Sequence, residues 1–205
     1  AFFVLRVFTA EIKPSVREVM EDMMVDTANL LAELASDDLA AGRLAQGDTD
    51  SAFARHVRNY VRRPIDAGIW GFAKQSLDYR IYVTDATGRV LFDSQGQAVG
   101  QDFSQWRDVA RTLRGEYGAR MTREVPSDDT SGVMHVAAPV LVQGRILGVL
   151  TVAKPVRTVQ RFIDRAERKV LMGGLVLLLL SAAVGVAVTL WMVWNVRRLR
   201  DYALS

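Results

Sequence analysis

The hydrophobic residues of this chain are distributed very unevenly along its length. Residues 170–194 form a run of 25 without a charged side chain, with basic residues close to both of its ends. At about 1.5 Å per residue, such a helix reaches roughly 37 Å, which is enough to cross a hydrocarbon core of about 30 Å. The run predicts a membrane-spanning helix, with Trp191 and Trp194 at one interface.

The chain opens on a second apolar run, residues 1–8, which is too short to cross a membrane. It lacks the basic start and the small-residue cleavage site of a signal peptide, so we interpret it as the end of another transmembrane helix. Residues 9–169 have an ordinary soluble composition and suffice for one domain. A soluble domain between two membrane helices is the layout of a receptor.

Helical periodicity dominates the first part of this domain. A helix is expected over residues 14–35, because apolar or small residues recur at spacings of 4 and 3: Val16, Met20, Met23, Thr27, Leu30 and Leu34. This stripe fits a core helix lying on a sheet, and it also fits a helix that pairs with its copy in a dimer. The two interpretations can hold on different faces.

A second helix is expected over residues 51–63, where Pro64 ends it. Its polar side carries four arginines: Arg55, Arg58, Arg62 and Arg63. These fit a solvated face, or a face that contacts lipid phosphates or an anionic ligand. The apolar loop that follows, residues 65–72, contains Trp70 and is expected to fold over a pocket or the core.

From Tyr79 the pattern becomes alternating, which predicts strands. A hairpin is expected over 79–84 and 89–94, around a turn that ends in Gly88. A short helix at 104–114 and strands at 117–125, 133–142 and 145–153 complete the domain. The predicted fold class is therefore α+β, with a central antiparallel sheet of about five strands. After Pro155, residues 156–169 form a helix that runs into the membrane span.

Composition removes several classes of function. The chain has no cysteine and two histidines, and its net charge is +3. It contains neither a glycine-rich phosphate loop nor a nucleophile elbow, and its basic and aromatic residues do not alternate as in nucleic-acid binders. We therefore expect no catalytic residue, no metal site, no cofactor and no nucleic-acid partner in this fragment.

Several motifs resemble a known family. The hairpin YRIYVTDATGRVLFDS, the connector AVGQDFSQW and the closing segment VMHVAAPVLVQGRILGVLTVAKP are similar to the PAS-like extracytoplasmic sensor domain, also called PDC or Cache. Over about residues 9–169 the chain resembles CreC-type two-component sensor histidine kinases. Residues 195–205 resemble the start of a HAMP linker.

This resemblance implies a homodimer in a bacterial inner membrane, with residues 9–169 in the periplasm and contacts to membrane lipid. It also implies a cytoplasmic kinase region outside this fragment, which binds ATP and phosphorylates a CreB-like response regulator. Counts of basic residues leave the orientation open, since four precede the span and three follow it. The same module also occurs in chemoreceptors and cyclic-dinucleotide enzymes, and a membrane-anchored binding protein without signalling output is a further alternative.

The resemblance also suggests where a ligand would bind. In carboxylate sensors of this fold, basic residues occupy positions that correspond to Val90, Asp93, His135 and Ala137, and of these His135 alone could serve. A citrate-like ligand is therefore not expected, because carboxylates need fixed cationic donors. The candidate ligand-binding residues are His135, Asp93, Arg120 and Tyr82.

Overall fold

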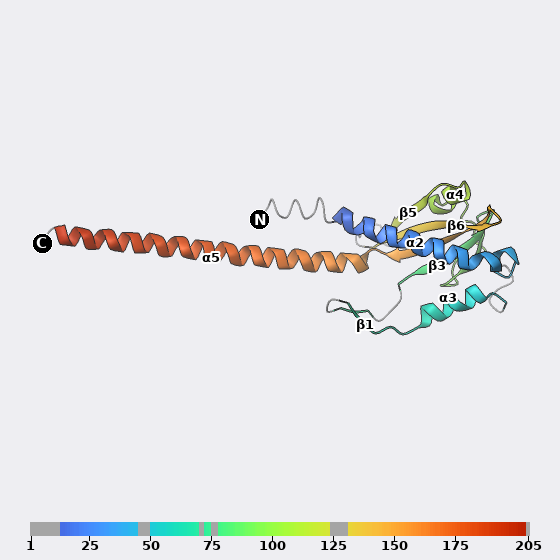
Figure 1. Ribbon diagram of the computed structural model, residues 1–205, viewed down its shortest axis with the longest axis horizontal. Coiled ribbons are helices and arrows are strands. Elements are labelled where there is room, and N and C mark those ends of the chain that lie inside the picture. The colour runs from blue at the N-terminus through green and yellow to red at the C-terminus, as the bar shows by residue number, and fades with distance from the viewer. Residues whose placement is uncertain (1–12, 45–49, 70–71, 75–77, 124–130, 204–205) are drawn as a thin grey trace. The chain divides into compact units, whose positions relative to one another are not determined.

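The computed structural model describes residues 13–44, 50–69, 72–74, 78–123 and 131–203 (Figure 1). Contacts divide the chain into two units. One is a compact domain, Ser15–Gln160, and the other consists of Ala1–Pro14 and Arg161–Ser205. The elements, in chain order, are α2 (Lys13–Ala40), α3 (Ala52–Arg62), β1 (Ala67–Ile69), β2 (Phe72–Lys74), β3 (Arg80–Asp85), β4 (Val90–Asp93), α4 (Arg107–Leu113), β5 (Gly118–Arg123), β6 (Gly132–Val142), β7 (Arg145–Pro155) and α5 (Arg157–Ala203).

The domain is built on one antiparallel sheet of five strands, in the order β4-β3-β7-β6-β5. Its centre is β7, which pairs with β3 on one side and with β6 on the other. Figure 1 shows α3 and α4 on opposite sides of this sheet. The predicted α+β class and the central antiparallel sheet of about five strands are confirmed.

Two tight turns account for the regular strand pairing. Gly88 ends the β3–β4 turn with φ of 87°, and its N–H donates to the carbonyl of Asp85 over 3.1 Å. Gln143 and Gly144 connect β6 and β7, and both have positive φ. Two consecutive left-handed residues match the twist of a hairpin, so the 11-residue strands β6 and β7 pair along nearly their full length.

The apolar segment at residues 65–72 was expected to be a loop, and this is wrong. Ala67–Ile69 and Phe72–Lys74 pair as a small separate antiparallel sheet. Backbone pairing over three residues satisfies polar groups that a loop would leave to water. Trp70, which was expected to cover a pocket, lies outside the described residues.

The long helix α2 is a core helix, but apart from Met20 its buried face differs from the predicted stripe. The helix ends at Ala40 rather than residue 35, and Met23, Leu30 and Leu34 are 61–63% exposed. The buried residues are Met20, Met24, Ala28, Ala32, Ala35 and Leu39. A face rich in alanine allows a helix axis to approach a sheet closely. The small residues of α2, rather than the large ones, therefore determine which face of the helix packs on the sheet. A row of large apolar side chains is left on the exposed face.

The connection from α2 to α3 is fixed by a buried carboxylate. Asp38 accepts hydrogen bonds from the Ser51 hydroxyl and the Phe53 N–H, each over 2.8 Å. Ser51 in turn accepts from the Ala54 N–H over 3.0 Å, as an N-cap of α3. Burial raises the pKa of Asp38, but these hydrogen bonds and Arg43 lower it more, so it stays below its usual range. The predicted second helix is confirmed.

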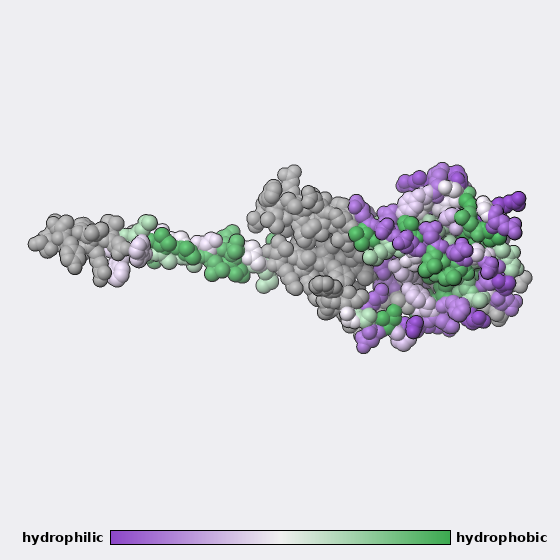
Figure 2. Space-filling view, in the orientation of Figure 1, coloured by the Kyte–Doolittle hydropathy of each residue, from purple (hydrophilic) through white to green (hydrophobic). Residues whose placement is uncertain are grey.

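One unbroken helix, α5, follows β7 and runs from Arg157 to Ala203. Its segment Leu171–Met192 is long and apolar enough to cross a membrane, and none of that segment is buried within the chain. Figure 2 shows hydrophobic surface along this helix. The predicted span agrees to within two residues at each end, whereas the predicted first span, residues 1–8, lies outside the described residues.

Candidate functional site

The two faces of the sheet differ in chemistry, and the candidate site lies on the face that carries α4. Residues of β3 alternate between the faces, so Ile81 and Val83 belong to the large apolar core with α2 and α3, while Tyr82 belongs to a second cluster with α4. A cluster of polar side chains lies on the second face, next to α4. They include the predicted site residues Tyr82, Arg120 and His135.

The centre of this polar cluster is Asp108 of α4, which is fully buried. Its carboxylate accepts from the Tyr82 hydroxyl over 2.5 Å, from Arg120 Nε over 2.6 Å and from the Thr151 hydroxyl over 3.3 Å. Burial raises the pKa of Tyr82 well above its usual value, and the neighbouring Asp108 carboxylate raises it further. The Tyr82 hydroxyl is therefore a permanent donor to Asp108.

His135 continues the cluster on the other side of Arg120. Its Nδ1 lies 3.3 Å from Arg120 Nη2, and its Nε2 lies 3.0 Å from the Thr122 hydroxyl. A guanidinium can only donate, so Nδ1 must accept and the ring proton must lie on Nε2. Burial, together with Arg120, lowers the pKa of His135 to about 4. The imidazole is neutral near pH 7.

Aromatic rings cover the guanidinium of Arg120. Its central carbon lies 4.1 Å from the centre of the Trp106 ring, a distance typical of a cation–π contact. Trp106 stacks on Phe103, and Phe103 meets Tyr82 edge to face at 5.3 Å. Phe103 and Trp106, which precede α4 in the chain, thus hold Arg120 in one orientation.

Asp93, the fourth predicted residue, has a different environment. Its carboxylate accepts two hydrogen bonds from Arg80, at 3.0 and 2.8 Å, and three more from the backbone N–H groups of Gln95, Gln97 and Ala98. Burial raises the pKa of Asp93, but Arg80 and these N–H groups lower it more, so it remains below its usual range. Asp93 fixes Arg80 and the turn after β4.

Arg80 and Arg120 meet at a cavity of about 270 Å³. His135, Thr122 and Trp106 also line it, whereas Tyr82 and Asp93 lie behind the two arginines. Both guanidinium groups are paired with buried carboxylates, the histidine is neutral and Asp78 also lines the cavity, so the cavity has no excess of positive charge. Its hydrogen-bonding chemistry suits a small polar molecule better than a multiply charged anion. Among the described residues, no cluster of acidic and histidine side chains could hold a metal ion.

Gly118 sets the distance between α4 and the sheet. A Cβ atom at this position would lie 2.1 Å from the Asp108 carbonyl oxygen and 2.2 Å from the Thr112 hydroxyl. Any side chain would therefore move α4 away from β5 and separate Asp108 from its partners.

Arg80 and Asp108 were not among the predicted site residues. Arg80 is two residues from Tyr82 on the same strand, so it shares the face of Tyr82. Asp108 lies within the predicted helix at 104–114, one position from the buried Val109. The sequence signal for Asp108 was its place beside this buried helix position. A carboxylate that is buried needs a charged or hydrogen-bonding partner, so such a position indicates a polar cluster.

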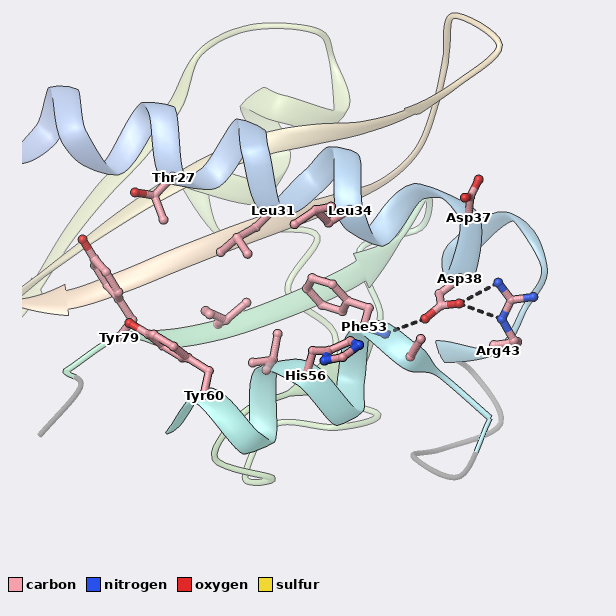
Figure 3. A pocket seen from close by; sticks show the side chains of 13 residues that line it. Thr27, Leu31, Leu34, Asp37, Asp38, Arg43, Phe53, His56, Tyr60 and Tyr79 are labelled. Carbon is pink, nitrogen blue, oxygen red and sulfur yellow. Dashed lines mark hydrogen bonds and ion pairs between the residues drawn. The ribbon is translucent and has the colours of Figure 1, made fainter. Parts of the chain in front are cut away.

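A larger cavity, of about 550 Å³, lies between α2 and α3 (Figure 3). Its walls are mostly apolar, with Leu31, Phe53 and Val57 among them. Tyr60 and Tyr79 lie at one end, and the Asp38–Arg43 ion pair, 2.6 Å long, lies at the other. None of the four predicted site residues lines it.

No family model matches the chain. Among solved structures, the fold is similar to the sensor domain of the Vibrio cholerae histidine kinase DctB, with 16% identity, coverage of 77% of this chain and 55% of that one, and a TM-score of 0.43. For the Escherichia coli DcuS sensor domain the identity is 18%, the coverage 71% and 98%, and the TM-score 0.46.

A curated relative is much closer in sequence. The chain is 44% identical, over all 205 residues, to Sensor protein CreC of Escherichia coli (strain K12). The match covers 42% of that relative, so the chain spans less than half of its length. The resemblance to CreC-type sensor proteins is thereby confirmed, and the chain is similar, from end to end, to a part of Sensor protein CreC.

Proposed function

We propose that this chain is the sensory and membrane-anchoring region of a two-component sensor histidine kinase. The observation that carries the proposal is the full-length similarity to Sensor protein CreC. The direct passage from β7 into the helix that contains the span supports it, because this helix is a covalent route from the domain to the membrane. Residues 9–169 would be periplasmic, and residues 195–205 would begin a HAMP linker.

A chimera tests this function. Residues 1–205 replace the matching region of Sensor protein CreC, and membranes that contain the chimera are supplied with ATP and the CreB-like response regulator. We expect phosphate transfer to the regulator at a level comparable to that of the parent protein. A chimera that reaches the membrane in equal amount but transfers no phosphate would contradict the proposal and favour a binding protein without output.

The same chimera tests transmission through α5. Replacing Phe162 and Ile163 by Gly-Gly should destabilise the helix by about 1 kcal/mol per residue. We expect phosphorylation to become fixed at one level, because a flexible joint absorbs small displacements. A matched Ala-Ala variant keeps helix propensity and should behave like the unmodified chimera.

The periplasmic location can be tested because the chain has no cysteine. Asn59 is exposed on α3, so Asn59→Cys should react with a membrane-impermeant maleimide in intact cells. Ala203→Cys, at the far end of α5, should react only after lysis. The reverse pattern would place the domain in the cytoplasm.

The homodimer is a further part of the proposal. The exposed apolar row on α2 supports it, because large apolar side chains in one row are typical of an interface between copies. Met23→Cys and Leu30→Cys should form disulfide-linked dimers under mild oxidation. Ala28→Cys is the control, since Ala28 is buried against the sheet and should not crosslink.

A further inference from the structure

The outer edge of β5 differs from the opposite edge of the sheet. At the β4 edge, the following segment covers the backbone: Val90 N–H donates to Gln101 and Gly100 N–H donates to Val90, over 2.9 and 2.8 Å. Strand β5 is the last strand on its side, and the backbone hydrogen bonds that the structure gives for its residues Gly118–Thr122 run to β6. Over these residues the outer side of the strand therefore offers donors and acceptors to another strand.

A hollow of about 490 Å³ follows this edge. Three consecutive residues, Ala119, Arg120 and Met121, all line it, although successive side chains of a strand point to opposite faces. One hollow can meet all three only if it lies along the edge of the strand and reaches both faces. Figure 1 shows β5 beside α4 and α2, and both helices contribute lining residues.

The two sides of this hollow differ in chemistry. On the α4 side, Arg107 and Arg111 lie one helical turn apart. Arg107 is exposed, and the structure gives it no ion pair with another described residue. On the α2 side, Met121 and Met134 line the hollow with apolar atoms; Met121 is 44% exposed, whereas Met134 is mostly buried.

The acidic residue in the hollow is already engaged. Glu21 of α2 accepts a hydrogen bond from the Tyr117 hydroxyl over 2.5 Å. Burial and this contact with Glu21 raise the pKa of Tyr117 above its usual value, so the hydroxyl remains a donor. Arg111 pairs with the exposed Glu116 over 3.1 Å, so Arg107 is the arginine of this hollow that remains available to an anion.

We propose that the β5 edge binds an extended acidic segment of a partner protein, which adds to the sheet as a sixth strand. A strand presents alternate residues to opposite sides. Acidic residues would therefore face Arg107 and Arg111, while the intervening apolar residues would contact Met121 and Met134. Backbone hydrogen bonds to β5 would provide affinity, and this alternation would provide specificity. The interaction does not depend on whether the cavity near His135 binds a ligand.

The test uses the complete chain in phosphatidylcholine nanodiscs. A fluorescein-labelled peptide of alternating glutamate and valine, six residues long, is titrated at low salt, and its fluorescence anisotropy is measured. We expect saturable binding, and at least tenfold weaker binding for the matching lysine–valine peptide. Arg107→Glu should weaken binding of the acidic peptide about tenfold, whereas Arg55→Glu, an exposed reversal on α3, should leave it within twofold.

Backbone methylation distinguishes strand addition from simple charge attraction. Two further peptides carry N-methyl groups on the valines or on the glutamates. We expect one of them to bind at least tenfold more weakly and the other to bind nearly normally, because alternate N–H groups face β5. Equal binding of both methylated peptides, or displacement of the peptide by millimolar inorganic phosphate at constant ionic strength, would overturn the proposal in favour of a small-anion site. Equal binding by the Arg107→Glu variant would also overturn it.

Discussion

Leu150 and Thr151 are neighbours on β7 and are both completely buried, yet they face different interiors. Leu150 packs into the apolar core between the sheet and the helices α2 and α3. Thr151 donates to Asp108 in the polar cluster under α4. The first interior is stabilised by contact area, which has no direction, and the second by hydrogen bonds and charges that require fixed geometry. One sheet therefore has a face that depends on contact area and a face that depends on fixed geometry.

The largest expected effect comes from the centre of the polar face. Asp108→Ala removes the acceptor of Tyr82, Arg120 and Thr151 and leaves a cation without its partner. We expect a loss of about 3–5 kcal/mol in the free energy of unfolding, because breaking a buried ion pair strands the other charge. Urea denaturation of the full chain in detergent, followed by near-ultraviolet circular dichroism, measures it. A loss below about 1 kcal/mol would mean that the cluster contributes little.

The matched substitution on the apolar face is Leu150→Ala. It leaves a cavity but no unpaired polar group, and we expect a loss of about 3 kcal/mol. This loss should be the same at pH 5 and pH 8 and at low and high salt, since Leu150 belongs to a cluster of apolar side chains. A strong dependence on pH would show that the two faces are coupled.

His135 provides the pH dependence that separates the faces. Because its pKa falls from the usual 6.5 to about 4 in the folded domain, the unfolded chain binds a proton more readily between these values. Stability should therefore fall as the pH drops from 6.5 to 4, by at most about 3 kcal/mol. In the same urea assay, the His135→Gln variant should not show this loss of stability between pH 6.5 and 4. His56→Gln, at an exposed position, should keep it.

The smallest expected effect is that of carboxylate ligands. Arg120 was predicted as a site residue and Arg80 was not, and the pairing of these two arginines with Asp108 and Asp93 supports the expectation that citrate, fumarate and malate do not bind. We expect no change in melting temperature at 10 mM acid, relative to chloride at equal ionic strength. A ligand at 100 times its dissociation constant adds about 2.7 kcal/mol, so a clear rise with any acid would refute this.

Strands and turns were predictable because they depend on neighbours in sequence. Alternation defines β3, β6 and β7, and Gly88 marks the hairpin turn. The buried face of α2 could not be predicted in this way. Leu30 and Leu34 dominate the hydrophobicity pattern, whereas Ala28 and Ala32 contribute little to it. Only the sheet surface opposite decides whether a helix packs through large or small residues.

The candidate site was predicted in part for the same reason. Tyr82, Arg120 and His135 were selected, and the fold brings them together. Arg80 and Asp108 complete the cluster through contacts between separate elements, which a single sequence does not reveal. Whether the cavity binds a ligand stays a prediction.

Gly118 has a consequence for anyone who alters this domain. The residue has no function of its own, but the absence of a side chain there determines how deeply α4 sits and therefore the dimensions of the cavity beside Arg120. In a screen of every substitution at every position, residue 118 should tolerate almost nothing, although it lies on an edge strand where tolerance is usual. The shape of this cavity is thus set partly by a hydrogen atom.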